Sequence, residues 1–281
     1  MKIIQNQTFD YERALYNLQD TLVYSCTFKG VRDGESVLKE CRNINVDNCQ
    51  FSLRYPLWHA HKYNIRNTTF FEPSRAPIWY AFDGILTNCK IYSVKAVREC
   101  DNIEINNSEI KSTEFGWKSN RIRINYSKIE SEYLFLESKN IQISNLEFKG
   151  KYSFQYVENV VINNSKLDTK DAFWHSKNVK VTNSIVKGEY LGWFSEGLTL
   201  INCKIIGTQP LCYCKNLKII DCEMIDCDLS FEYSEVDASI KGYIESIKNP
   251  KSGTIRVDKV GSIINSDSVM ECNAKIIVNK K

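Results

Sequence analysis

Asn102-Ile103-Glu104-Ile105-Asn106-Asn107-Ser108 is one copy of a short pattern that recurs along most of the chain. Another copy is Asn159-Val160-Val161-Ile162-Asn163-Asn164-Ser165, and a third occupies residues 178–184. Each copy has an Asn, apolar residues two positions apart, a second Asn and a small residue. A recurring unit of this kind decides the fold before any single helix or strand is assigned.

The last, small residue of each copy is an anchor from which the period can be measured. The consecutive steps from Cys89 to Cys222 are all of equal length, and this length defines the regular period of the repeat. Two steps are longer, from Cys26 to Cys49 and from Thr68 to Cys89, and they indicate small insertions near the N-terminal end. The anchors are Cys26, Cys49, Thr68, Cys89, Ser108, Ser127, Leu146, Ser165, Ser184, Cys203 and Cys222.

The period and the residue types predict a β-solenoid. A repeat of about 19 residues is too short for a helical hairpin, and its β-branched apolar positions and Asn turns are typical of short strands. Each coil stacks on the preceding one at about 4.8 Å, the strand spacing within a sheet. We expect one all-β domain, a single-stranded parallel β-helix of about ten coils. Residues 1–30 would form an N-terminal cap and first coil, 31–228 the regular coils, and 229–281 irregular C-terminal coils and a cap.

The register of the repeat predicts which side chains face the interior. Three positions before the anchor stands a column of aliphatic residues, and two positions after it stands a column of aliphatic and Phe residues. Eight positions before the anchor only small residues occur, as expected at an inner corner. The 11 Cys lie mostly in this small column or the anchor column, so we interpret them as buried packing residues with free thiols.

Composition limits the classes of function. The net charge of +3 gives no support to binding of nucleic acid or of an anionic membrane surface. No apolar run approaches the roughly 20 residues that span a bilayer. Polar residues already follow Ile4 within the first seven positions, so this segment lacks the apolar core of a signal peptide. We therefore expect a cytoplasmic protein without nucleic-acid or membrane partners.

One outward column carries all five Trp residues of the chain. It lies ten positions before the anchor and also contains charged and amide residues, which are rarely buried in a narrow core. The next position is rich in aromatic and charged residues, so the two columns predict an exposed aromatic stripe that binds a ligand. The predicted ligand-binding residues are Trp58, Trp79, Arg98, Trp117, Glu137, Tyr156, Trp174 and Trp193.

A group of titratable side chains on the same face suggests a catalytic alternative. These residues fall on adjacent coils, about 5 Å apart, which is within reach for general acid–base chemistry. The signal is not specific, because charged residues are ordinary on any outer face. The candidate catalytic residues are Glu40, His59, Tyr80, Glu99 and Lys118.

No metal or other cofactor is expected. His59 and His175 lie six coils apart and cannot share a metal ion. The cysteines between 212 and 227 have a superficially zinc-like spacing, but Cys214 and Cys222 fall in inward columns and the set would not converge. A Gly-rich phosphate loop, a nucleophile elbow and a dinucleotide fingerprint are all missing from the sequence.

Three motifs carry a resemblance to a known family. The segments 12–16 (Glu-Arg-Ala-Leu-Tyr), 33–40 (Asp-Gly-Glu-Ser-Val-Leu-Lys-Glu) and 246–253 (Ser-Ile-Lys-Asn-Pro-Lys-Ser-Gly) resemble an uncharacterised bacterial family, domain of unknown function 3737. That family is grouped with the right-handed parallel β-helices that include pectate lyases, so the resemblance implies a right-handed coil. It brings no established activity or catalytic residues. The Asn-Thr-Asp, Asp-Asp and Gly-His-Gly motifs of polygalacturonases and the acidic calcium cluster of pectate lyases are missing here.

Three hypotheses about function remain open from the sequence. The first is binding of an oligosaccharide or a sugar-bearing ligand along the aromatic stripe, whose flat rings suit the C–H faces of sugars. The second is a glycan lyase or glycoside hydrolase that acts on the same face. The third is an interaction scaffold, in which the stripe is covered by a partner protein or by a second copy in a homo-oligomer.

Overall fold

The computed structural model describes residues 2–30 and 34–279. Asp33, which begins one of the motifs behind the resemblance, and the chain ends Met1, Lys280 and Lys281, which belong to the predicted caps, lie outside the described residues. The chain divides into two compact units, Met1–Gln142 and Ile143–Lys281, called unit 1 and unit 2 below. The expectation of a single domain stays a prediction.

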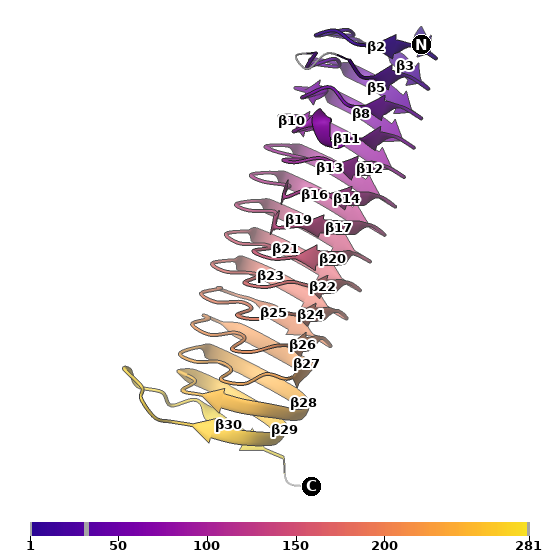
Figure 1. Ribbon diagram of the computed structural model, residues 1–281. Coiled ribbons are helices and arrows are strands. Elements are labelled where there is room, and N and C mark those ends of the chain that lie inside the picture. The colour runs from indigo at the N-terminus through magenta and orange to yellow at the C-terminus, as the bar shows by residue number, and fades with distance from the viewer. Residues whose placement is uncertain (1, 31–33, 280–281) are drawn as a thin grey trace. The chain divides into compact units, whose positions relative to one another are not determined.

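Unit 1 is a stack of parallel coils, each containing a longer and a shorter strand (Figure 1). The regular coils follow one another at a constant offset, since Leu86 pairs with Ile105 and Ile105 with Ile124. Its longer strands are β1 (Lys2–Gln5), β3 (Thr21–Tyr24), β5 (Arg42–Asp47), β8 (His61–Arg66), β11 (Phe82–Thr87), β13 (Asp101–Asn106) and β16 (Asn120–Asn125). Its shorter strands are β2 (Thr8–Phe9), β4 (Thr27–Phe28), β6 (Gln50–Phe51), β7 (Leu57–Trp58), β9 (Thr69–Phe70), β10 (Ile78–Trp79), β12 (Lys90–Tyr92), β14 (Glu109–Lys111), β15 (Glu114–Phe115), β17 (Lys128–Ser131) and β18 (Tyr133–Leu134).

Unit 2 repeats the same parallel arrangement and ends in longer strands. Ile162 pairs with Val181, and Leu200 pairs with Ile219, at the same offset as in unit 1. After β19 (Lys139–Ser144), which spans the unit boundary, its strands are β20 (Glu147–Gly150), β21 (Glu158–Asn163), β22 (Lys166–Asp168), β23 (Lys177–Thr182), β24 (Ile185–Lys187), β25 (Thr199–Ile201), β26 (Lys204–Ile206), β27 (Leu217–Ile225), β28 (Glu235–Lys248), β29 (Ser252–Ile264) and β30 (Lys275–Val278).

The predicted fold class, an all-β parallel β-solenoid with a coil spacing near 19 residues, is confirmed, but the predicted number of coils is wrong. The chain forms about 14 turns instead of about ten. At the N-terminus, Ile4 pairs with Val23 at the regular offset, but the anchor position of this coil holds the exposed Gln7 in place of a small residue. Near the C-terminus, Ile240 pairs with Val257, so the coils have become shorter than the regular period and a search at that period misses them.

In the core of each unit, side chains of the same kind stack on one another from coil to coil. In unit 1, four Phe rings from successive coils form one stack, with ring centroids 5.2, 4.4 and 4.8 Å apart. In the predicted small column, Ser138 donates a hydrogen bond to the carbonyl of Gly116 and accepts one from the amide of Ser119. Only a short side chain can reach both backbone groups, so the restriction to small residues has a hydrogen-bonding cause as well as a steric one. The stacked rings are Phe9, Phe28, Phe51 and Phe70.

The recurring Asn before each anchor marks a tight corner. Asn107 in unit 1 and Asn183 in unit 2 have left-handed backbones, with φ of 49° and 50°. Asn tolerates this conformation better than most residues. The side chains also bond between coils, since the amide of Asn202 donates to the amide oxygen of Asn183 at 2.9 Å. The Asn column is therefore structural.

The described residues contain little helix. The one helical segment among residues 2–30 and 34–279 is a 3₁₀ turn, η1 (Glu72–Ser74), within the second of the two insertions. No helix in this part of the chain is both long enough and apolar enough to cross a membrane.

All eleven cysteines are free, and ten of them are buried. Burial raises the pKa of Cys41 and of Cys100 to about 12. A hydrogen bond with Cys222 instead lowers the pKa of Cys203 from its usual value, although this residue is only 2% exposed. Only Cys272 is partly exposed.

We predict that the native protein presents one fast-reacting thiol to the aromatic disulfide reagent DTNB, because only an accessible thiolate attacks. Cys272→Ser should remove that fast phase, and the other ten thiols should react only after unfolding in guanidinium. A second fast thiol in Cys272→Ser would contradict the burial of the cysteine columns.

Candidate functional site

Two adjacent positions are at least partly exposed on the same side of most coils, whereas Cys212 at the end of the series is buried. The second of the two has a left-handed backbone in every coil from Glu40 to Tyr213, with φ between 50° and 61°. This conformation interrupts the strand alternation, so neighbouring side chains no longer point to opposite faces. The first position, called the tryptophan column, holds Lys39, Trp58, Trp79, Arg98, Trp117 and Leu136 in unit 1, and Gln155, Trp174, Trp193 and Cys212 in unit 2. The second, called the corner column, holds Glu40, His59, Tyr80, Glu99, Lys118 and Glu137 in unit 1, and Tyr156, His175, Phe194 and Tyr213 in unit 2.

The five Trp side chains are half-buried, and three of them tie neighbouring coils together. In unit 1 the indole N–H of Trp117 donates to the carbonyl of Tyr133 at 2.9 Å. In unit 2 Trp174 and Trp193 donate to the carbonyls of Tyr190 and Gln209 at 2.6 and 2.8 Å. These indoles therefore have a structural role in addition to any contact with a ligand.

Trp58 and Trp79 form a separate aromatic cluster in unit 1. Their rings stack 5.3 Å apart at an interplanar angle of 17°. Tyr55 packs against both, with centroids 6.0 Å from Trp58 and 5.7 Å from Trp79. Lys39 places its ammonium 4.2 Å from the Trp58 centroid, a cation–π contact. Unlike Trp117, Trp58 has a buried indole N–H with no hydrogen-bond partner among the described residues.

The predicted catalytic residues lie on successive coils in the corner column of unit 1, and each pairs with a neighbour in that column. His59 Nδ1 lies 2.9 Å from Glu40 Oε1. A hydrogen bond to Glu99 raises the pKa of Tyr80. Lys118 Nζ lies 3.7 Å from the carboxylate of Glu137. The column therefore separates into a Glu–His pair, a Tyr–Glu pair and a Lys–Glu pair.

Arg98 contacts two carboxylates and an aromatic ring. Its guanidinium lies 3.3 Å from Glu99 and 3.3 Å from Glu114. Its carbon Cζ also lies 5.4 Å from the ring centroid of Trp117. These contacts engage the Arg98 and Glu99 charges within the protein, which makes both less suited to binding a substrate.

Unit 2 carries an exposed ladder of aromatic rings in its corner column. The centroids of Tyr156 and His175 are 4.9 Å apart, those of His175 and Phe194 are 5.0 Å apart, and those of Phe194 and Tyr213 are 4.8 Å apart. All three interplanar angles are 15° or less. The inner rings therefore cover each other's faces and present their edges to solvent.

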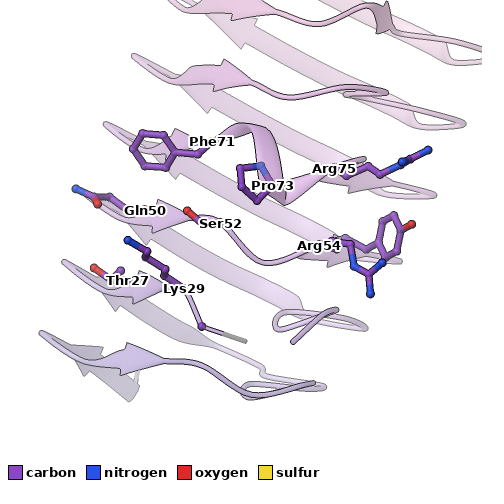
Figure 2. Close-up of a pocket in the computed structure, with 10 residues that line it drawn as sticks. Thr27, Lys29, Gln50, Ser52, Arg54, Phe71, Pro73 and Arg75 are labelled. Atoms are coloured by element: carbon purple, nitrogen blue, oxygen red, sulfur yellow. The ribbon is translucent and has the colours of Figure 1, made fainter. Parts of the chain in front are cut away.

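A hollow of about 720 Å³ in unit 1 was not predicted from the sequence (Figure 2). It lies where the two longer steps interrupt the regular period, between residues 27–30 and the segment around η1. The two longer steps are visible in the sequence, but they do not predict which side chains line the hollow. The hollow is lined by Thr27, Lys29, Gly30, Gln50, Ser52, Arg54, Tyr55, Phe71, Pro73 and Arg75.

Tyr55 connects this hollow with the aromatic cluster. It lines the hollow and at the same time contacts Trp58 and Trp79. Trp58 in turn lies 5.9 Å, centroid to centroid, from His59 of the Glu–His pair. The hollow, the stacked Trp pair and the paired His are thus contiguous within unit 1.

A metal centre is not formed by the part of the chain that the structure describes. There, no three His, Cys, Asp or Glu side chains lie close enough to hold an ion. The cysteines with zinc-like spacing, from Cys212 to Cys227, are each buried in the coil interior.

We predict that Trp117→Phe destabilises the protein by about 1 kcal/mol more than Trp58→Phe. Both changes remove a similar ring segment, but only the first removes a hydrogen bond, the one from the indole to the carbonyl of Tyr133. Urea unfolding followed by circular dichroism measures the difference. Equal losses of stability in the two variants would show that the indole bond contributes nothing.

Several solved structures are similar to this chain in fold. A mutant tailspike protein of E. coli bacteriophage HK620 in complex with a hexasaccharide has 9% identity and a TM-score of 0.48, covering 93% of this chain and 68% of that one. The catalytic domain of a GH87 α-1,3-glucanase in complex with nigerose has 8% identity and a TM-score of 0.44, with coverage of 98% and 63%. PfbA, a surface adhesin of Streptococcus pneumoniae, has 8% identity and a TM-score of 0.37, with coverage of 92% and 80%.

Sequence comparison is more specific. No curated protein sequence matches the chain. The family model described as "Protein of unknown function (DUF3737)" matches residues 2–278, which is nearly the whole chain and confirms the resemblance seen in the three motifs. The chain belongs to the DUF3737 family.

Proposed function

We propose that the protein binds an oligosaccharide in the hollow of unit 1, with Tyr55 and Phe71 as its aromatic lining. The observation that carries this proposal is that aromatic rings and hydrogen-bonding side chains line the same hollow. Its volume of about 720 Å³ falls within the range of about 300–1,000 Å³ typical of ligand sites.

The chemistry of the lining suits a sugar. A sugar ring has an apolar C–H face, which packs on an aromatic ring, and a rim of hydroxyls, which needs donors and acceptors. Tyr55 and Phe71 supply rings, and Phe71 is 39% exposed. Thr27, Gln50 and Ser52 supply polar side chains that make no hydrogen bond to any other described residue. These groups are available to a ligand without breaking an internal contact.

The stacked ladder of unit 2 suits a sugar less well. A sugar would pack on the face of a ring, yet the faces of His175 and Phe194 are occupied by neighbouring rings no more than 5.0 Å away. Trp174 and Trp193 stack on each other in the same way, at 5.5 Å and 5°. We therefore assign binding to unit 1, where the stacked Trp pair supports Tyr55 at the edge of the hollow.

We predict that Phe71→Ala and Gln50→Ala each weaken oligosaccharide binding, the first by about tenfold, which corresponds to lost apolar contact. An array of neutral and acidic oligosaccharides identifies the ligand, and calorimetric titration measures its affinity. Tyr126→Ala is the matched control, because Tyr126 is 66% exposed in unit 1 and does not line the hollow. Absence of binding to every oligosaccharide, or equal losses in the control, would refute the proposal.

A second candidate, catalysis on the bound glycan, is favoured by the contact between Glu40 and His59. A carboxylate that accepts a hydrogen bond from Nδ1–H leaves the other ring nitrogen as a base and stabilises the imidazolium that forms. His59 is 42% exposed and lies beside Trp58, so a ligand in the neighbouring hollow could reach it. Glu40 would orient the ring, and His59 would transfer the proton.

We predict that, if this pair is catalytic, His59→Gln lowers the rate of glycan cleavage about a hundredfold while the dissociation constant stays unchanged. Mass spectrometry of the products measures cleavage. Glu137→Gln is the control, since it lies in the same column and pairs with Lys118. Unchanged cleavage in His59→Gln would exclude this role without affecting the binding proposal.

A further inference from the structure

We propose that the hollow of unit 1 binds an oxyanion, meaning a carboxylate, sulfate or phosphate group carried by the ligand. The inference deepens the proposed function, on which it rests for the sugar part of the ligand, because it assigns a charge to the bound oligosaccharide. It does not follow from the overall composition, since the net charge of the whole chain is only +3.

Among the described residues, three cationic side chains and no carboxylate line the hollow (Figure 2). Lys29 follows β4, Arg54 follows β6, and Arg75 follows η1, so three separate segments contribute a cation to the lining of the hollow. Like charges that share a concave surface raise its potential and attract an anion.

Two of these cations have no counter-ion within the part of the chain that the structure describes. Arg54 lies 3.5 Å from the carboxylate of Glu35. Across residues 2–30 and 34–279, however, Lys29 and Arg75 form no ion pair with any carboxylate. The nearby acids Asp10, which lies against Gly30, and Glu72, in the segment before Arg75, are included in that statement.

Two of the other Lys side chains in the same column do have a carboxylate partner. Lys29 lies three positions after its anchor, and the same column contains Lys111 and Lys187. Lys111 lies 3.8 Å from Glu130 and Lys187 lies 3.9 Å from Asp168, each one coil away within its own unit. The next residue of this column after Lys29 is Ser52 rather than an acid, and the one after that is Phe71. In this column, therefore, no acid lies on the two coils after Lys29, and a carboxylate carried by a ligand can take that place.

The uncharged lining completes the site. The hydroxyls of Thr27 and Ser52 and the amide of Gln50 can donate hydrogen bonds to anionic oxygens, and a hydrogen bond to a charged group is stronger than one between neutral groups. Phe71 and Pro73 form an apolar side that can contact the rest of the ligand.

Four probes test this inference on the full chain: glucose, glucuronate, glucose 6-phosphate and inorganic phosphate. Titrations followed by ¹⁵N NMR report shifts of the amides of Ser52 and Phe71. We expect at least one acidic sugar to bind about tenfold more tightly than glucose, and added NaCl to weaken it. The order of glucuronate and glucose 6-phosphate shows whether the carboxylate or the phosphate is preferred.

Variants give the decisive comparison. Lys29→Gln and Arg75→Gln should each weaken acidic-sugar binding about tenfold. Lys62→Gln, on the exposed side of β8 and outside the hollow, should leave it unchanged. Ser52→Ala, which keeps all charges, should weaken binding less. Thermal unfolding of each variant establishes that it is folded.

The outcomes separate this inference from the proposed function. Equal binding of glucose and both acidic sugars would overturn the oxyanion site and leave oligosaccharide binding intact. If inorganic phosphate binds, and neither glucuronate nor glucose 6-phosphate binds more tightly than phosphate does, the oxyanion site is supported and the sugar function is contradicted. Absence of shifts at Ser52 and Phe71 with every anion, or equal affinities in Lys29→Gln and Lys62→Gln, would overturn the oxyanion site.

Discussion

The structure depends on one constraint, the in-register hydrogen bonding of parallel coils. Because the backbone of each coil bonds to the next at a fixed offset, such as Ile105 to Ile124, every side chain meets its counterpart one coil away. Each column must therefore hold residues that are compatible with their own kind. Stacked Phe rings, small residues that bond to the backbone and Asn at left-handed corners are three solutions to this single requirement.

The same constraint places opposite charges beside each other in some outer columns. In a regular outer column a Lys can meet an acid on the neighbouring coil, as Lys111 meets Glu130 at 3.8 Å. An insertion changes which residues surround a position. The two insertions of unit 1 frame the hollow, and there Lys29 and Arg75 lack such partners among the described residues. The irregular segments thus create both the space and the charge for a ligand.

Regular columns could be predicted from the sequence, whereas the site could not. The period and the alternation of apolar residues identified the fold and the inward positions, since these follow from local spacing. The number of coils was underestimated because Gln7 occupies an anchor position and because the coil from Ile240 to Val257 is shorter than the regular period. The pairing of His59 with Glu40 followed from their shared column, but the hollow depends on the path of inserted chain, which no periodicity describes.

The stacking of similar side chains on successive coils also limits which ligands a solenoid surface can bind. A column of rings such as Tyr156, His175 and Phe194 gains stability from contact between ring faces, and the same contact removes those faces from a ligand. Recognition by a ring face therefore requires a break in the column. Phe71 is such a break, because the next residues of its column on either side, Ser52 and Tyr92, do not continue a Phe stack, and the chain departs from the regular coil immediately after it at η1. Its partial exposure beside polar side chains is a consequence of that interruption, which is why we place binding there and not on the longer ladder.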